Sequence, residues 1–383
     1  MKQLFSSAAV RLPWIDHLRT VLIVLVVNLH ACVTYSHVGD WYIMSEHEPT
    51  LSQKLPFIVW QGHLQSFFMG LLFFISAYFA HGALSRRGPG AFVRERLLRL
   101  GAPAVLYMLV IHPFILIGLN PWDHAFGPAP AFYADYVLSG HFLSGSGPLW
   151  FAVALLLFSL ALAAWRRVVP LRNCASEQGR APSARLLGGC ALALGGATFA
   201  VRLVQPIGTN VLNLQLCFFV QYICFFLAGV HAARHGWLLP LALSARARFA
   251  GKLTLCLSAP LLLAIIVVGA KTGKPSAFFG GWHWQAFAFA LWEQLTGVGL
   301  SLGLLALFAQ KFNAESARMR WLADRSFGVF LLHAPVIIAL AMLFRALPQH
   351  MYLLVALLTV SGLALSFLLS DLARRIPVLR RMI

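Results

Sequence analysis

Residues 18–38 read LRTVLIVLVVNLHACVTYSHV, an apolar stretch with His30 about halfway along it and Arg19 near its start. A helix of this length crosses a hydrocarbon core of about 30 Å. His30 and Arg19 are eleven residues apart, so at about 100° per residue they lie on the same face of a helix. A protonatable side chain at membrane depth is expensive to keep, and the sequence therefore marks His30 as a candidate functional residue.

The rest of the chain has the composition of a polytopic membrane protein. Of its 383 residues, 60% are hydrophobic and only 11% are charged, and the mean hydropathy of +0.77 is far above that of a soluble domain. We predict an all-α bundle of about ten transmembrane helices, with residues 1–383 forming one integral-membrane domain. The predicted spans are residues 18–38, 60–81, 100–119, 148–168, 186–203, 214–233, 251–270, 284–309, 327–345 and 350–370.

The basic residues are distributed unequally between the two sides of the predicted bundle. The net charge of +18 would by itself suit an acidic partner such as nucleic acid. Changing sides at each span, however, places all but five of the 30 Lys and Arg residues on the side of the N-terminus; the five are Lys54, Arg202, Lys271, Lys274 and Arg345. This bias follows the positive-inside rule and predicts that both termini are cytoplasmic. Nucleic-acid binding is not needed to explain the charge.

The predicted loops are too short to fold as a separate domain, so the chemistry must take place in or at the membrane bundle. The six cysteines form no C-x-x-C pair, and five of them fall within predicted spans. They indicate neither a metal site nor a disulfide framework. We expect no metal ion and no permanently bound cofactor, and the sequence sets no oligomeric state.

Polar residues follow one face of the first span. His30, Thr34 and His37 are spaced i, i+4 and i+7, and Asp16 and Arg19 extend the stripe toward the N-terminus. Lipid offers such a stripe no hydrogen-bond partners, so it should face protein or a water-filled cavity. His30 is then either a catalytic group or only a hydrogen-bond partner of a neighbouring helix. His37 also fits an interfacial residue near the outer surface.

Arginines gather between the second and third spans. The second span ends in FFISAYF at residues 73–79, which includes Ser76, and Arg94, Arg96 and Arg99 precede the third span. Guanidinium groups bind phosphate through two parallel hydrogen bonds, so this cluster suits a phosphate-bearing donor such as a coenzyme A thioester. The alternative is a topology signal that also contacts anionic lipid.

Two later spans contain further candidate residues. Glu293 is the most conspicuous carboxylate within an apolar stretch, and its alternative interpretation is a helix-end residue wetted at the outer interface. His333 follows Ser326 by seven residues, which places both on one face of the ninth span. His333 is either a catalytic group or a packing histidine beside the kink of Pro335.

These segments, in this order, resemble the acyltransferase 3 family of membrane enzymes. The resemblance covers about residues 14–370. It rests on Ile15-Asp16-His17-Leu18-Arg19 followed by His30, on FFISAYF at 73–79, on the arginines before Pro103, on Leu149-Trp150-Phe151 and on Ser326 to Pro335. Within the family the chain is most similar to the glucan biosynthesis protein C branch, whose members are associated with succinylating periplasmic glucans. The Glu293 segment and RIPVL at residues 375–379 also fit that branch.

The resemblance implies an enzyme that transfers acyl groups other than amino-acyl groups. The donor would be a cytoplasmic acyl-CoA-type thioester, and the acceptor a hydroxyl of an extracytoplasmic carbohydrate. His30 and Arg19 match the family's first-span histidine and arginine, and Arg94, Arg96 and Arg99 match its arginine-rich stretch. The expected substrate-binding residues also include Asp16, Ser76, Trp150 and Ser326. One departure is visible, because Ser76-Ala77 stands where the family usually has serine-glycine; we expect looser helix packing there.

A mechanism follows in which the His30 imidazole removes the proton of the acceptor hydroxyl while that oxygen attacks the thioester carbonyl. An acyl-histidine relay is the other route, and Glu293 would orient an imidazole or the sugar. The branch resemblance favours a succinyl group over acetyl and a periplasmic glucan as acceptor, at the cytoplasmic (inner) membrane of a bacterium. The competing hypotheses are a proton-coupled transporter or permease for a small solute, which usually shows paired, interrupted helices, and a lipid-embedded scaffold that has no need of His30.

Overall fold

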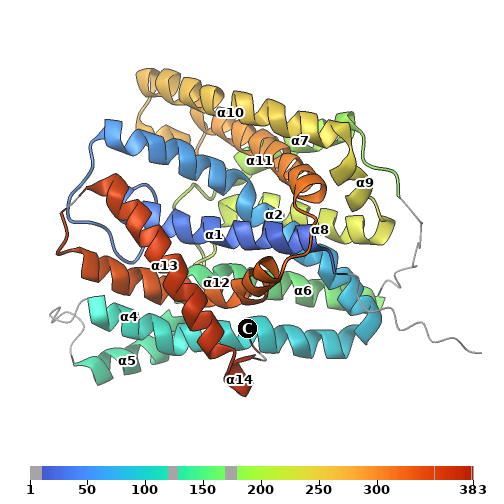
Figure 1. Cartoon of the computed structure of the whole chain (residues 1–383). Helices are drawn as coiled ribbons and strands as arrows, with labels where there is room; N and C mark the ends of the chain where they lie inside the picture. The colour runs from blue at the N-terminus through green and yellow to red at the C-terminus, as the bar shows by residue number, and fades with distance from the viewer. Residues whose placement is uncertain (1–10, 120–127, 169–178, 349, 381, 383) are drawn as a thin grey trace, which may run out of the picture.

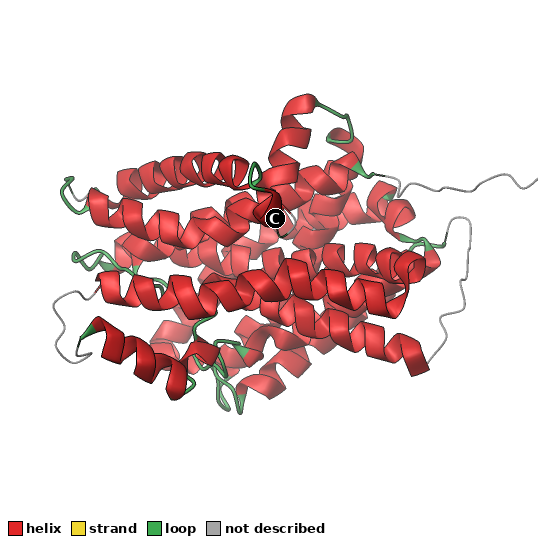
Figure 2. Ribbon diagram, turned by 90° about the horizontal axis from the view of Figure 1, so that it is seen from below, coloured by secondary structure: helices red, strands yellow, loops and turns green. Residues whose placement is uncertain are grey.

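The computed structural model describes residues 11–119, 128–168 and 179–383, apart from 349, 381 and 383. This part of the chain is built from helices joined by short loops (Figures 1 and 2). The described residues form no strand, only one isolated bridge between Val211 and Leu214. The prediction of an all-α bundle is confirmed.

Among the described residues nine helices are long, and the other helices are short segments before or after them. The long helices are α1 (Pro13–Ser36), α2 (Leu51–Arg96), α6 (Trp150–Val168), α7 (Ala184–Arg202), α8 (Phe219–His235), α10 (Ala245–Thr272), α11 (Trp284–Lys311), α12 (Ala317–Phe344) and α13 (Met351–Ala373). The short α-helices are α3 (Ala102–Leu106), α4 (His112–Leu119), α5 (Ala129–Leu138), α9 (Leu238–Leu243) and α14 (Pro377–Arg380). π-helical turns at Leu97–Gly101 and Tyr107–Ile111 join α2, α3 and α4 into one helical stretch.

Nine helical stretches of the described residues are long and apolar enough to cross a membrane. The second of them, Leu51–Leu119, is 69 residues long and contains two predicted spans, 60–81 and 100–119. Gly88 interrupts it with φ of +77°, and Pro89, which has no N–H to donate, follows. In Figure 1 the chain turns back in this region and returns to α4 at the left of the view. The nine stretches are therefore compatible with the ten predicted spans, and the number of crossings stays a prediction.

Local sequence signals explain where several helices begin. Pro13 opens α1, where its missing N–H would have no partner anyway. Thr50 and Gln53 form a capping box at the start of α2. Ser244 and Ser316 accept backbone N–H groups as the N-caps of α10 and α12.

Helices α1, α11 and α12 form the interior of the bundle. In each of them 61% of the apolar span is buried, compared with 17% for α10. α1 packs against α12, α13, α2 and α11, and Figure 1 shows it running between these helices. The polar stripe of the first span therefore faces protein, as the sequence predicted.

One end of the bundle, which we call the basic end, is held together by arginines at the helix termini. Arg11, just before α1, donates to Asp324 in the first turns of α12 at 3.1 Å. Arg374, after α13, donates to the Asp324 carbonyl at 2.6 Å. Arg166, in the last turn of α6, donates to Ser85 of α2 at 3.0 Å. These contacts place helix ends together as the alternating topology requires.

The packing of α2 on α8 at Ala77 depends on a glycine of the other helix. A Cβ built on Gly229 of α8 would lie 2.2 Å from the Phe74 carbonyl oxygen and 3.0 Å from the Ala77 Cβ. Ala77 is fully buried. The close approach that a glycine at position 77 would allow is thus supplied by Gly229, and the expectation of looser packing at Ser76-Ala77 is wrong.

Candidate active site

Two histidines from distant parts of the sequence meet between α1 and α12. His333 Nε2 lies 3.2 Å from His30 Nδ1, and the ring centroids are 5.0 Å apart. The His333 side chain is 0% exposed, and His30 is half-buried. The structure therefore brings together the two histidines that the sequence marked separately.

The hydrogen bonds of His333 determine which nitrogens of this pair carry protons. His333 Nδ1 lies 2.7 Å from the Phe330 carbonyl oxygen, and because a carbonyl only accepts, Nδ1 carries the proton. The Nε2 atom of a neutral His333 then has a lone pair, so His30 Nδ1–H must donate to it. His30 Nε2 is left with its own lone pair, and this nitrogen can accept a proton from a substrate.

Trp41 covers the His30 ring from the loop that follows α1. Its ring centroid lies 3.9 Å from that of His30 at an interplanar angle of 30°. The loop is tied to α1 by Ser45 N–H, which donates to the Thr34 carbonyl at 2.8 Å, and by His37 Nε2, which donates to the Ser45 carbonyl at 2.8 Å. The Trp41 and His333 centroids are 6.5 Å apart, so the three rings form one cluster in which the imidazole contacts both Trp41 and His333.

A group of tyrosines lies beside Trp41, whose ring contacts that of Tyr42 with centroids 5.1 Å apart. Tyr107 donates to the Tyr42 hydroxyl at 3.2 Å, and Tyr42 contacts the His112 ring at 5.6 Å between centroids. Burial raises the pKa of Tyr42, so it stays a neutral hydroxyl. Gly147, with φ of +47°, fits here because a Cβ at this position would lie 2.3 Å from the Tyr42 oxygen.

Arg19 and Asp16 lie at the basic end of α1, away from the histidine pair. Asp16 accepts from Arg11 Nε at 2.6 Å and from Arg19 Nη2 at 3.3 Å. The Nε atom of Arg19 is buried and has no hydrogen-bond partner in the described structure. Eleven residues of helix separate Arg19 from His30 by about 16 Å along the axis. Arg19 and His30 share a helix face, as predicted, but they are too far apart to contact the same small ligand.

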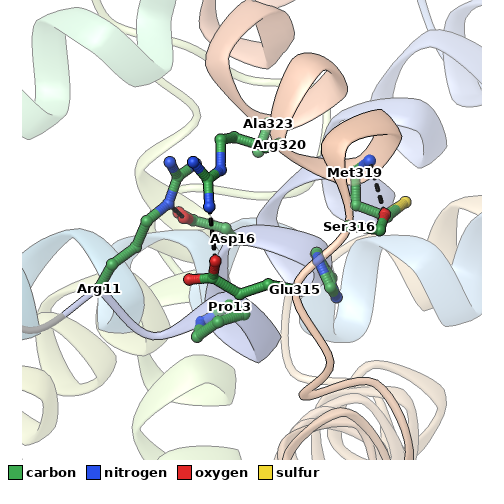
Figure 3. Close-up of a pocket in the computed structure, with 9 residues that line it drawn as sticks. Arg11, Pro13, Asp16, Glu315, Ser316, Met319, Arg320 and Ala323 are labelled. Atoms are coloured by element: carbon green, nitrogen blue, oxygen red, sulfur yellow. Dashed lines mark hydrogen bonds and ion pairs between the residues drawn. The ribbon is translucent and has the colours of Figure 1, made fainter.

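A small pocket lies beside Asp16 (Figure 3). Its volume is about 10 Å³, roughly the minimum that holds one water molecule. Two ion pairs close it, Arg11 with Asp16 and Arg320 with Glu315, as Figure 3 shows. The pocket is too small for a nucleotide in this conformation.

The arginines before the third span gather close to Arg19. Arg87 and Arg99 both contact Glu95, Arg96 stacks over the Phe92 ring at 4.9 Å, and Arg94 lies in the last turn of α2. Arg99 is near enough to Arg19 for the two charges to repel each other. The guanidinium groups of two separate segments therefore converge at the basic end.

Glu293 lies in a polar network inside the bundle. Its carboxylate accepts from Arg202 Nη2 at 2.6 Å and from Gln294 Nε2 at 3.3 Å, and Gln294 in turn accepts from Gln221 at 2.9 Å. The Glu293 side chain is 2% exposed, so the interpretation as a wetted helix-end residue is wrong. Among the described residues its partners are Arg202 and Gln294 rather than an imidazole.

The remaining predicted residues lie along the helices around this site. Ser326 is buried, but its hydroxyl donates to Ala323 of its own helix at 2.9 Å. Trp150 stacks on Tyr222 with centroids 5.6 Å apart, and Ser76 is half-buried in α2. Thr34 donates to the His30 carbonyl at 2.9 Å. The hydroxyls of Ser326 and Thr34 are therefore already hydrogen-bonded to backbone carbonyls of their own helices.

A family model described as an acyltransferase domain, Acyl_transf_3, matches residues 12–371, nearly the whole chain. The chain belongs to this acyltransferase family. Neither the curated proteins nor the solved structures contain a match to it. Together with the apolar helices, membership makes the protein an integral-membrane acyltransferase. The match identifies the family and no branch within it.

Sequence reasoning did not assign two residues of the site in this acyltransferase. Trp41 lies in a loop, where no helical periodicity could connect it to His30. Arg202 was placed only as one of the few basic residues on the outer side, and its pairing with Glu293 joins α7 to α11. The available signals were the aromatic residues of the loop after α1 and the scarcity of basic residues on that side.

Proposed function

We propose that this acyltransferase moves an acetyl or succinyl group from a cytoplasmic acyl-CoA-type donor to a hydroxyl of an extracytoplasmic carbohydrate. The observation that supports this most directly is the histidine pair, in which His30 Nε2 keeps a free lone pair while Nδ1 is held by His333. An alcohol is a poor nucleophile until a base takes its proton, and a neutral imidazole is suited to that task near pH 7.

The reaction proceeds by one addition and one elimination. His30 Nε2 accepts the proton of the acceptor hydroxyl, and that oxygen forms a bond to the thioester carbonyl carbon. The carbon–sulfur bond then breaks, and the thiolate of the donor leaves and takes the proton from the imidazolium. His333 continues to accept from His30 Nδ1–H throughout, so it is a positioning residue that fixes the ring and its tautomer.

The donor's phosphates fit the basic end of the bundle. Arg19, Arg96 and Arg99 supply guanidinium groups, and buried Nε atoms of Arg19 and Arg96 have no partner among the described residues. The axial separation of about 16 Å between Arg19 and His30 suits a long thioester whose phosphates lie far from the reacting carbonyl. In this assignment Arg94 guides the donor electrostatically and Asp16 orients Arg19.

The other candidate residues have supporting roles in this proposal. Trp150 and Ser76 are assigned to binding of the donor between the basic end and the histidines, and the Ser326 hydroxyl donates to the Ala323 carbonyl within α12. Glu293 anchors α7 to α11 through Arg202. Both termini are assigned to the cytoplasm of a bacterium with the bundle in its inner membrane, and a periplasmic glucan is the acceptor favoured by the branch resemblance.

The substitution His30→Ala tests the mechanism. We expect it to lower acyl transfer by at least roughly 10²- to 10⁴-fold, the contribution typical of a general base, at an unchanged protein level in the membrane. Mass spectrometry of surface glycans from a deletion strain, complemented with either form, measures the acyl ester. Esters restored by His30→Ala would remove His30 from the mechanism, and unchanged esters in the deletion strain would overturn the acceptor assignment.

A further inference from the structure

A cavity of about 350 Å³ lies at the outer ends of α1 and α12, the two helices that hold the histidine pair. This volume falls within the range of small-molecule sites, about 300–1,000 Å³. The residues that line it are Thr34, Tyr35, Ile43, Met44, Ser45, Glu46, His47, Ala341 and Arg345. It is separate from the basic end and from the small pocket beside Asp16.

The floor of the cavity is buried and contains an unsatisfied polar group. Tyr35 is 5% exposed, yet its hydroxyl has no hydrogen-bond partner in the described structure. A buried hydroxyl without a partner is unfavourable and calls for an explanation. Tyr35 lines the cavity, but its hydroxyl is closed off in this conformation, so a ligand seated there supplies the missing partner only when the Tyr35 side chain turns toward it.

The position of the cavity connects it to the catalytic pair. Thr34 follows His30 by one helical turn on the same face, about 6 Å along the axis. The loop that stacks Trp41 on His30 continues directly into Ile43 and the residues up to His47 that line the cavity. At the other side, Glu46, His47 and Arg345 are exposed and form its rim. His30 itself does not line the cavity, so a long ligand seated here would reach it only from the Thr34 end, with the rest of the ligand outside.

From these observations we infer that the cavity binds the carbohydrate acceptor, a neutral polyol whose reacting hydroxyl points toward His30. This inference rests on the proposed function. A polyol needs donors and acceptors together with an apolar or aromatic surface, and the cavity offers the Tyr35 ring and hydroxyl, the Ser45 hydroxyl and a rim of both charge signs. An anionic lipid headgroup would find a carboxylate, Glu46, at the same rim.

Binding to the full-length protein in nanodiscs tests the site without turnover. The probe is a linear β-glucan hexasaccharide, titrated by calorimetry into His30→Ala, which keeps the cavity intact. Adding Tyr35→Phe removes only the hydroxyl and should weaken binding roughly 3- to 10-fold. Adding Ala341→Leu narrows the floor, where Ala341 is 4% exposed, and should weaken binding at least about tenfold.

The matched control is Tyr352→Phe, a tyrosine of α13 outside the cavity whose hydroxyl donates to Gln53; it should leave binding within about twofold. The proposed site would be overturned if neither cavity substitution changed the affinity for the hexasaccharide. It would also be overturned if folded His30→Ala bound no hexasaccharide, or if the protein retained only phospholipid. Glycan analysis separates this outcome from the proposed function. If acyl esters are formed but the cavity substitutions do not change binding, the acceptor binds elsewhere. If the cavity substitutions weaken binding but no acyl esters are formed, the cavity is a carbohydrate site and the proposed activity is refuted.

Discussion

At the scale of single residues, the direction of the hydrogen bond between the two histidines is the most testable feature. If His333 acts by accepting from His30 Nδ1–H, then an amide oxygen at position 333 should replace it in part. We expect His333→Leu to lower kcat by roughly 10²- to 10⁴-fold, the range for removal of an orienting group, and His333→Gln to lose at least about tenfold less. KM should change little.

Acyl transfer in proteoliposomes measures these variants, and His63→Gln in α2 is the control, because His63 bonds to Ser258 outside the site. Equal losses in His333→Leu and His333→Gln would reduce His333 to a packing residue.

The buried ion pair of Arg202 and Glu293 makes a second residue-scale prediction. Glu293→Gln leaves the Arg202 charge buried without its counter-ion, which should lower the free energy of unfolding by about 3–5 kcal/mol. Combining it with Arg202→Met removes both charges and should recover most of this loss. Denaturant titration of the detergent-solubilised protein gives the stabilities. A double variant that folds and retains acyl transfer confirms the anchoring role, while one that folds but is inactive would show that the carboxylate acts in the reaction.

At the scale of helices, α10 and α11 cross at a pair of glycines. A Cβ built on Gly251 would lie 2.3 Å from the Gly303 Cα, and one on Gly303 would lie 2.7 Å from the Gly251 Cα. Small residues of this kind allow membrane helices to approach closely. We expect Gly303→Ala to force the helices apart and to lower stability by about 1–3 kcal/mol.

The control for this crossing is Gly196→Ala in α7, where a Cβ would meet nothing within 4 Å. Because alanine is the better helix former, this change should be neutral or stabilising by up to about 1 kcal/mol. Thermal unfolding of both variants in the same detergent compares them, and equal melting temperatures would contradict the close crossing.

At the scale of the whole molecule, the charge bias and the gathered helix ends predict which side faces the cytoplasm. Arg318, exposed at the start of α12, belongs to the basic end, and His47 is exposed at the rim of the outer cavity. In a cysteine-depleted background, His47→Cys should react with a membrane-impermeant thiol reagent in intact cells. Arg318→Cys should react only after permeabilisation. The reverse pattern would invert the topology and move the proposed acceptor cavity to the cytoplasmic side.

The sequence by itself determined the helical membrane class and the approximate positions of the long apolar helices. It could do so because an apolar segment in lipid must satisfy its backbone hydrogen bonds internally, so length and hydropathy suffice. The sequence did not predict that the residues between the second and third expected spans would also be helical. The two spans lie in one helical stretch, which is interrupted only at Gly88 and Pro89. Periodicity also placed His30, Thr34 and Arg19 correctly on one face, because a helix face repeats at a fixed angle.

Only the tertiary structure decided which of these residues meet. His30 and His333 pair because α1 packs on α12, and Glu293 turned out to bind Arg202 because α7 packs on α11. Trp41 reaches His30 through a loop, where no periodic rule applies. Contacts between helices depend on side-chain shape and on close approaches such as that at Gly229. A single helix's pattern of residues records its own exposed and buried faces, but it does not record the partner that covers each face.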